Sequence, residues 1–171
     1  IKEAIDRQWT GGGPLVSEFE DRWSKHINCE LSVALNSCTA ALHLALLCQN
    51  FEKGKKVLVP TMTFASTATA VLYCGLEPVF VDSDSNTLGM CLDDLSKKYD
   101  EDCVAVIPVH YGGHPVPMDK LVPWALKRSL LVIEDCAHTS GSIYKGKALG
   151  TWGDIGCYSF EEKKIMVTGD G

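Results

Sequence analysis

The sequence has no long apolar run, and its first residues are not expected to form an export signal. Within its 171 residues, no stretch approaches the roughly 20 apolar residues that cross a bilayer, which argues against a membrane protein. Residues 1–7 lack the apolar core of a signal peptide. None of the eight cysteines forms a Cys-x-x-Cys pair, and the five histidines do not cluster with them. We therefore expect reduced, mostly buried thiols, a cytoplasmic location and no metal site.

Excess positive charge and a dinucleotide-binding glycine motif are also missing. The 16 Lys and Arg are outnumbered by 22 Asp and Glu and are scattered, which argues against a nucleic-acid partner. A Gly-x-Gly-x-x-Gly turn would indicate a nicotinamide dinucleotide domain, but Asn-Ser-Cys-Thr at 36–39 follows the first predicted strand. Gly-Gly-Gly-Pro at 11–14 has no strand before it and no Gly-Lys-Ser/Thr after it, which favours a flexible turn over a phosphate loop.

Short apolar segments alternate with helical patterns along most of the chain. The segments are apolar throughout, which is typical of strands buried on both faces of a sheet. This alternation predicts an α/β fold, a three-layer α/β/α sandwich with a mostly parallel sheet. No repeat or low-complexity linker divides the chain, so we expect one domain over residues 1–171. Strands are expected at 32–36, 56–59, 78–82, 104–109, 130–134 and 155–160, and helices at 39–49, 65–74, 92–99 and 118–128.

Polar residues collect where predicted strands end and helices begin, which is where open α/β sheets bind ligands. These junctions lie at 36–39, 61–64 and 134–138. At the first junction, Ser37 is placed to cap the next helix, which leaves the backbone amides of Cys38 and Thr39 free to bind a phosphate. Taken alone, an ordinary capped helix is the simpler interpretation.

Asp135 and Lys164 indicate a more specific chemistry. Asp135 follows an apolar strand, and Lys164 lies five residues after Ser159. An amine that forms a Schiff base, a carboxylate that pairs with a pyridinium nitrogen and a hydroxyl that binds a phosphate are what pyridoxal 5′-phosphate requires. Lys163 is adjacent, and chemistry alone does not choose between the two lysines. Each residue also has a structural interpretation, since most lysines are surface residues and a buried aspartate can form an ion pair.

Other junction residues fit the same site. Phe64 begins a helix at the sheet edge, where its ring could cover one cofactor face, although most such residues belong to the core. His138 could donate to a phenolic oxygen or stack on a ring, and an ordinary loop histidine is an equal alternative. His110 is expected to be structural or to support a neighbouring site residue, and Glu134, a weaker candidate than Asp135, to point to the opposite face of the sheet.

Together these segments resemble the DegT/StrS sugar-nucleotide aminotransferases, a branch of the aspartate-aminotransferase fold (fold type I) of pyridoxal-phosphate enzymes. The resemblance covers nearly the whole chain, in order and with similar spacing. No single motif would suffice, but their combination is highly specific. The matching segments are 10–14, 36–42, 59–64, 78–82, 108–110, 133–141 and 157–171.

The resemblance implies roles for the residues closest to the reaction. Lys164, rather than Lys163, would occupy the Schiff-base position. Asp135 would be the partner of the pyridine nitrogen, and His138 would lie beside the phenolic oxygen. A dehydratase branch of the family has His in place of the lysine, so Lys164 argues for transamination.

The resemblance also implies which residues hold the rest of the cofactor. Phe64 would stack on the ring, while Ser159 and the Cys38–Thr39 turn would contact the phosphate. Cys38 stands where many relatives have Gly. The contact there is a backbone amide, so the change matters only if the backbone needs a positive φ.

The function that follows is transfer of an amino group, from a donor such as glutamate or glutamine, to a nucleotide-linked keto-sugar in amino-sugar and polysaccharide biosynthesis. Relatives are longer homodimers that share residues between active sites. Residues 1–171 would then be the large cofactor-binding domain, with both ends cut, the small C-terminal domain absent and the fragment inactive alone. A dehydratase or lyase on the same scaffold, and a regulatory protein that only binds the cofactor, are the alternatives.

Overall fold

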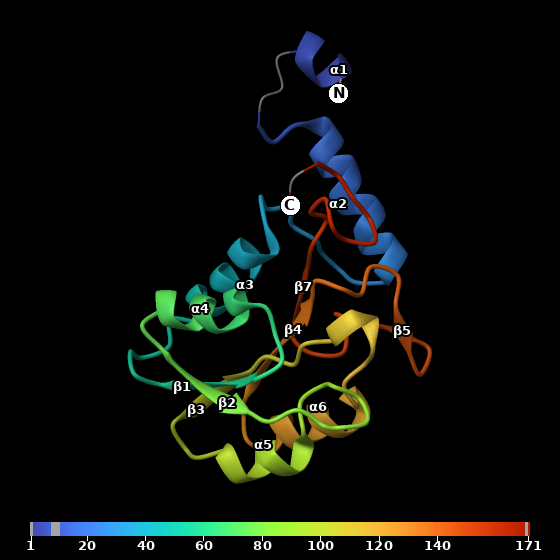
Figure 1. Ribbon diagram of the computed structural model, residues 1–171. Coiled ribbons are helices and arrows are strands. Elements are labelled where there is room, and N and C mark those ends of the chain that lie inside the picture. The colour runs from blue at the N-terminus through green and yellow to red at the C-terminus, as the bar shows by residue number, and fades with distance from the viewer. Residues whose placement is uncertain (1, 8–10, 170) are drawn as a thin grey trace. The chain divides into compact units, whose positions relative to one another are not determined.

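The computed structural model describes residues 2–7, 11–169 and 171 (Figure 1). Thr10 and Asp170, which belong to two of the matching segments, lie outside the described residues. The chain divides into two compact units, residues 1–35 and residues 36–171. Every candidate site residue named above belongs to the second unit.

The first unit contains two helices, α1 (Lys2–Asp6) and α2 (Pro14–Ile27). Pro14 occupies the first position of α2, where its fixed φ suits a helix and its missing N–H leaves nothing unpaired. Asn28 ends the helix in the left-handed conformation, with φ of 56°. The helices expected from the sequence did not include α2, and residues 11–14 lead directly into it.

The predicted strand at 32–36 is wrong, because residues 31–35 have no regular secondary structure. An extended segment becomes a strand only when a neighbouring strand takes up its backbone groups. Here the amide of Ala34 donates instead to the carboxylate of Glu20, at 2.8 Å. Leu31 and Val33 are 77% and 67% exposed. The apolar residues of this segment therefore do not pack in a core.

The second unit is built on a five-stranded sheet with the strand order β2-β1-β3-β4-β7. Every neighbouring pair in this sheet is parallel, which confirms the predicted α/β fold. The other predicted strands all appear in the sheet, with their ends shifted by a few residues. The observed strands are β1 (Lys56–Pro60), β2 (Glu77–Val81), β3 (Cys103–Val106), β4 (Leu131–Cys136) and β7 (Ile155–Tyr158).

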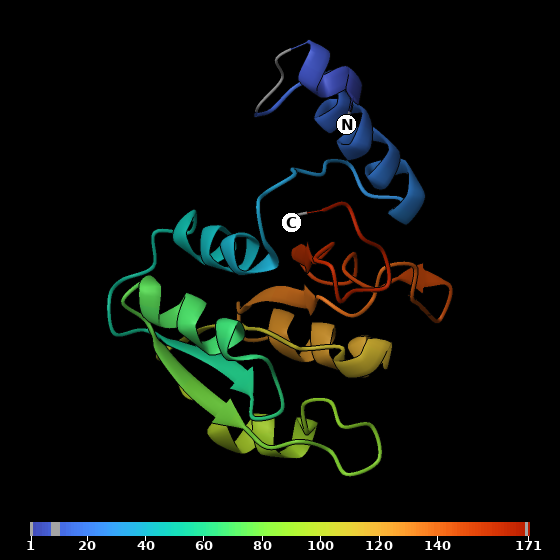
Figure 2. The ribbon, with the colours of Figure 1, turned by 45° about the horizontal axis from the view of Figure 1, so that its top comes forward.

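Helices cover both faces of this sheet. Figure 2 shows α3 (Cys38–Leu47) and α4 (Ala65–Tyr73) on one side, and the opposite side is covered by α5 (Leu92–Lys98) and α6 (Met118–Leu126). Alternate residues of one strand serve the two layers: Val57 and Val59 pack in the core under α3 and α4, and Leu58 packs in the core under α5 and α6. A strand with a core on each side has no polar face, which explains the continuous apolar segments.

The same alternation separates the acidic residues of β4. Ile133 packs in the core under α3 and α4, and Val132 packs in the core under α5 and α6. Because successive side chains of a strand point to opposite faces, Asp135 follows Ile133 toward α3 and α4, and Glu134 follows Val132 toward the other layer. The strand therefore presents one carboxylate to each side of the sheet.

The chain after β3 continues alongside β4. The amide of Asp135 donates to the carbonyl of Pro108 at 2.9 Å, and the amide of His110 donates to the carbonyl of Asp135 at 3.3 Å. These bonds place 108–110 next to the end of β4. After β4 comes an antiparallel hairpin of β5 (Ile143–Tyr144) and β6 (Lys147–Ala148), which the sequence did not predict.

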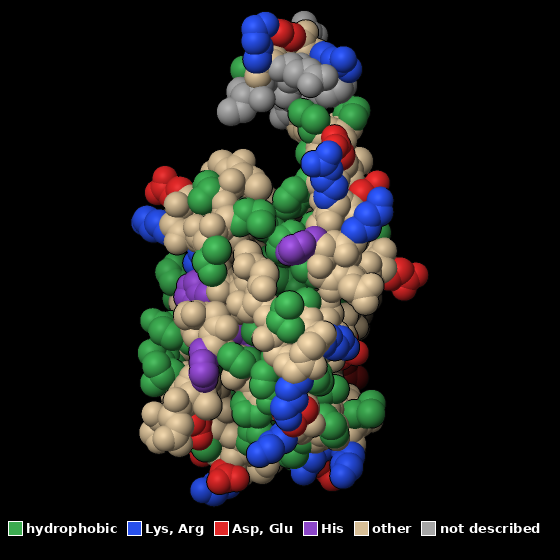
Figure 3. Space-filling model, turned by 90° about the vertical axis from the view of Figure 1, so that its right-hand side faces the viewer, with side chains coloured by type: hydrophobic (Ala, Val, Ile, Leu, Met, Phe, Trp, Pro, Cys, Tyr) green, Lys and Arg blue, Asp and Glu red, His purple; other side chains and the backbone are tan. Residues whose placement is uncertain are grey.

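Other expectations concern the surface and the cysteines. Among the described residues, every helix falls short of the length and apolar character of a membrane span. On the face shown in Figure 3, Lys and Arg side chains are interspersed with Asp and Glu. All eight cysteines are free, and burial is less complete than expected: Cys48 is exposed, three are partly exposed, and the four buried ones are Cys38, Cys103, Cys136 and Cys157.

Candidate cofactor site

Asp135 is a buried carboxylate at the carboxyl end of β4, with 4% of its surface exposed. Its Oδ2 accepts a hydrogen bond from the Thr67 hydroxyl at 2.8 Å, and its Oδ1 accepts one from the Ala137 amide at 3.2 Å. Burial raises the pKa of Asp135, and these two bonds oppose the shift. A cationic partner would offset the cost of keeping the group ionised in this position.

Thr67 is a residue of this site that the sequence did not indicate. It lies on α4 with no exposed surface, and its hydroxyl is 2.6 Å from the hydroxyl of Thr63. The signal that could have found it is a threonine on the face of α4 that also buries Ala70 and Val71. A hydroxyl in such a position needs a hydrogen-bond partner, and Asp135 at the end of β4 is that partner.

The N-terminus of α3 lies in the same region. Ser37 caps the helix, because its hydroxyl accepts a hydrogen bond from the Ala40 amide at 3.1 Å. The amides of Cys38 and Thr39, in the first turn, have no partner within the helix. Cys38 is the first residue of α3 and is not among the residues with positive φ, so a cysteine in place of glycine does not strain the backbone.

The thiol of Cys38 connects α3 to β7. Its Sγ donates to the carbonyl of Cys157 at 3.5 Å. Burial raises the pKa of Cys38, the negative charge of Asp135 adds to this rise, and the positive charge of Lys164 opposes it. Burial likewise raises the pKa of Cys157 to about 12, again with a contribution from Asp135. Both thiols are therefore neutral and act as small packing groups between the helix and the strand.

Lys164 follows β7 in a turn in which its amide donates to the Glu161 carbonyl at 2.9 Å. Its side chain is partly buried, and that of Lys163 is exposed. Burial lowers the pKa of His138, the charge of Lys164 lowers it further, and Asp135 opposes both effects. Lys164 and Asp135 thus act on the same two side chains, His138 and Cys38, although no hydrogen bond joins them directly within the described residues.

Ser159 directly follows β7, and Phe64 lies in the segment that joins β1 to α4. Ser159 is buried, and its hydroxyl donates to the Gly171 carbonyl at 3.4 Å and accepts from the Glu161 amide at 3.5 Å. Phe64 directly precedes α4 and is 76% exposed. Both residues stand at the edge where the parallel strands end. Neither forms a hydrogen bond with Asp135 or Lys164 among the described residues.

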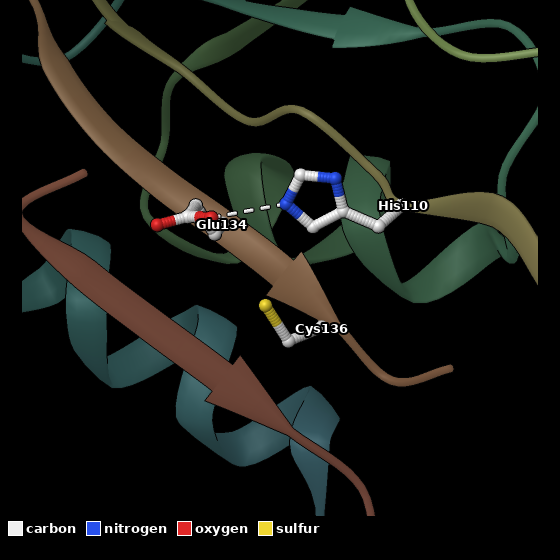
Figure 4. A group of neighbouring side chains, drawn as sticks. All are labelled: His110, Glu134 and Cys136. Carbon is white, nitrogen blue, oxygen red and sulfur yellow. Dashed lines mark hydrogen bonds and ion pairs between the residues drawn. The ribbon is translucent and has the colours of Figure 1, made fainter. Parts of the chain in front are cut away.

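Glu134, on the other face of β4, belongs to a fully buried group with His110 and Cys136 (Figure 4). The potential ligand atoms of these three residues lie within 4.8 Å of one another, a spacing that could suit a metal ion. Both imidazole nitrogens of His110 are already engaged, however. Nε2 lies 3.0 Å from the Glu134 carboxylate, and Nδ1 accepts from the Val116 amide at 3.1 Å. The group is therefore a hydrogen-bonded support rather than a metal site.

Glu134 also anchors the loop before β7. Its two carboxylate oxygens accept the amides of Gly150 and Gly153, at 2.8 and 2.7 Å. The backbone passes so close to β4 that a Cβ at Gly153 would lie 2.7 Å from a side-chain carbon of Val132. The structural role of His110 agrees with one of the two roles expected of it, and Glu134 lies on the opposite face of β4 from Asp135, as expected.

Comparison with known proteins adds the following. Residues 1–171 match the DegT/DnrJ/EryC1/StrS aminotransferase family. GDP-perosamine synthase from Escherichia coli O157:H7 is 39% identical over 172 residues, which cover 100% of this chain and 47% of that protein. The dTDP-4-dehydro-2,3,6-trideoxy-D-glucose 4-aminotransferase of Saccharopolyspora spinosa is 37% identical over 173 residues, 100% of this chain and 45% of that protein.

A solved structure shows the same fold. Spr1654 from Streptococcus pneumoniae, in its PLP form, superposes with a TM-score of 0.90 at 30% identity, over 99% of this chain and 48% of that one. This chain therefore spans about half the length of the relatives that it matches.

Proposed function

Because this chain belongs to the DegT/DnrJ/EryC1/StrS aminotransferase family, we propose that it forms the cofactor-binding part of a pyridoxal 5′-phosphate-dependent aminotransferase that acts on a nucleotide-linked keto-sugar. The observation that carries the proposal is that a partly buried lysine and a buried carboxylate lie around the same two side chains. Lys164 and Asp135, 29 positions apart in the sequence, act on the same neighbours, Cys38 and His138.

The residues present fit this cofactor. Asp135 is a buried carboxylate whose pKa is raised by burial, so a positively charged ring nitrogen would relieve the cost of its ionisation. The first-turn amides of Cys38 and Thr39 and the positive end of α3 suit a phosphate. The exposed ring of Phe64 is available to cover a flat ligand.

When bound, pyridoxal 5′-phosphate supplies an aldehyde carbon and an electron-withdrawing ring. Lys164 would hold that carbon through its Nζ and, once displaced by the donor amino acid, move a proton away from the donor Cα. Asp135 would keep positive charge on the ring nitrogen throughout. His138 would contact the phenolic oxygen, and Ser159 would assist the α3 amides in holding the phosphate.

The substrate and partners are proposed from the relatives. GDP-perosamine synthase and the dTDP-sugar aminotransferase carry nucleotide sugars in their names, which supports a nucleotide-sugar acceptor. Glutamate or glutamine is the proposed amino donor. A homodimer with shared active sites, a cytoplasmic location and a small C-terminal domain beyond this chain complete the proposal.

The first experiment locates the reactive amine. Full-length protein is incubated with pyridoxal 5′-phosphate, reduced with borohydride and mapped by peptide mass spectrometry. We expect the label on Lys164, its loss in Lys164→Arg and its retention in the matched control Lys163→Arg. A label on Lys163, or no label, would refute the assignment. Amine transfer from glutamate is expected to fall by at least about 10²-fold in Lys164→Arg, and cofactor binding without transfer in the wild type would instead indicate a regulatory protein.

A further inference from the structure

His138 accepts a hydrogen bond from the main chain of a neighbouring turn. The turn is η1 (Tyr111–Gly113), and the amide of Gly112 donates to Nδ1 of His138 at 3.2 Å. The ring of Tyr111 meets the imidazole edge-on, with centroids 5.6 Å apart and an interplanar angle of 80°. His138 is therefore held from one side by two groups of the same turn.

This bond decides where the imidazole proton resides. A neutral imidazole has one N–H and one bare nitrogen, and only the bare nitrogen can accept the Gly112 amide. We propose that the Gly112 amide fixes His138 in the tautomer protonated on Nε2, so that the side chain presents a hydrogen-bond donor to the cofactor site. The consequence for the cofactor rests on the proposed function; the tautomer itself does not.

A doubly protonated His138 would place an N–H against the amide of Gly112, and two donors cannot bond each other. The charged groups that act on the ring are Lys164, which favours the neutral form, and Asp135, which favours the charged form. Burial favours the neutral form as well, and Tyr111 adds a ring contact. The geometry and the local charges thus agree on a neutral imidazole.

The turn that supplies the amide is held firmly. His110, directly before it, accepts the Val116 amide at Nδ1 and lies 3.0 Å from Glu134 through Nε2, so both ends of 110–116 are fixed. Gly113 has φ of 81°, and a Cβ there would lie 3.0 Å from the His138 carbonyl oxygen. A side chain at this position would push the turn away from His138.

The donor has a chemical use. A phenolic oxygen beside Nε2 would gain a hydrogen bond that stabilises its negative charge, whereas a bare nitrogen would repel it. Gly112 and the turn act only through His138, so they are positioning elements, and the contact with the cofactor belongs to His138 alone.

The first test needs no cofactor. Full-length, cofactor-free protein labelled with ¹⁵N-histidine is examined by NMR, with the His138 signals assigned by their loss in His138→Gln. We expect Nε2 in the range of protonated nitrogens and Nδ1 in the range of bare ones. The reverse pattern, or averaged shifts for the two nitrogens, would overturn the proposal. This result is independent of whether pyridoxal 5′-phosphate binds.

The second test uses two substitutions, each of which retains the hydrogen-bonding role of only one imidazole nitrogen. In His138→Gln the amide group can take the place of Nε2–H, and in His138→Asn the side-chain oxygen can accept from Gly112 but is too short to reach the cofactor. Loss of a hydrogen bond to a charged group weakens binding on the order of tenfold or more. We expect His138→Asn to lose more affinity for pyridoxal 5′-phosphate than His138→Gln, whereas equal losses or the opposite order would contradict the donor role. If the wild type binds none, the proposed function fails and the NMR result alone decides the tautomer.

Discussion

Glu134 and Asp135 are neighbours in β4, and both are buried, but the two faces of the sheet surround them differently. Glu134 accepts two backbone amides and pairs with His110, so its carboxylate is fully used by the protein. Asp135 accepts one hydroxyl and one backbone amide, and together with Lys164 it acts on Cys38, the first residue of α3. A buried charge that the fold satisfies is a structural support, and one that it satisfies only in part is available for a ligand.

The strongest way to test this difference is to remove the structural carboxylate. Glu134→Ala leaves two backbone amides and the His110 N–H buried without partners. We expect a loss of about 3–5 kcal/mol in the free energy of unfolding, because removing one partner of a buried interaction leaves the other partners buried without hydrogen bonds. Denaturant unfolding measures the effect, and Glu101→Ala, at an exposed position, is the control. A loss below about 1 kcal/mol, the size of a surface pair, would mean that Glu134 is not a support.

On the other face of the sheet, a second substitution removes the hydroxyl that donates to Asp135. Thr67→Val keeps the shape of the side chain but deletes its donor. A hydrogen bond to a charged group contributes about 1.5–3 kcal/mol, so cofactor affinity is expected to fall roughly 10-fold or more while the fold persists. Fluorescence titration with pyridoxal 5′-phosphate measures the change. Thr69→Val, whose hydroxyl donates to the Ser66 carbonyl at 3.4 Å, is the matched control on the same helix. Equal effects of the two substitutions would remove Thr67 from the site.

The sequence predicts the strands and the main site residues better than it predicts the groups that hydrogen-bond to those residues. The strands and the positions of Asp135 and Lys164 follow from apolar segments and local motifs. Thr67 and the Gly112 amide were missed because each acts on a residue far away in sequence, and only the packing of α4 and the turn after β3 brings them together. The strand expected at 32–36 is absent for a related reason, because a strand forms only where a neighbouring strand accepts its backbone hydrogen bonds.

Turn chemistry limited the prediction elsewhere. The hairpin of β5 and β6 turns at Lys145 and Gly146, both with positive φ, of 47° and 79°. Asn-Gly is the usual sign of such a turn, and a lysine at the first position gives a weaker signal. Local patterns therefore give the scaffold, and the residues that tune its buried charges require the tertiary structure.

The smallest expected effect is a difference in pH dependence between a buried carboxylate, Asp135, and a partly exposed one, Asp119. Burial raises the pKa of Asp135 above the ordinary value of an aspartate, so the folded state binds this proton more tightly than the unfolded state. Its contribution to stability therefore falls as pH rises from the ordinary Asp pKa of about 3.9 through the higher pKa of the folded state. Asp135→Asn lacks this decline, so its stability relative to the cofactor-free wild type is expected to increase with pH in that window.

Asp119 supplies a control of opposite sign. Hydrogen bonds from Lys145 and Tyr144 lower its pKa, so its contribution is present above the unfolded pKa and is lost as pH falls through the folded one. Asp119→Asn is therefore expected to lose stability relative to the wild type as pH rises, the reverse of Asp135→Asn. Urea unfolding of both variants across the acid range measures the two slopes. Slopes of the same sign would show that Asp135 is stabilised as an anion by the protein itself, and the distinction between the two faces of β4 would then be lost.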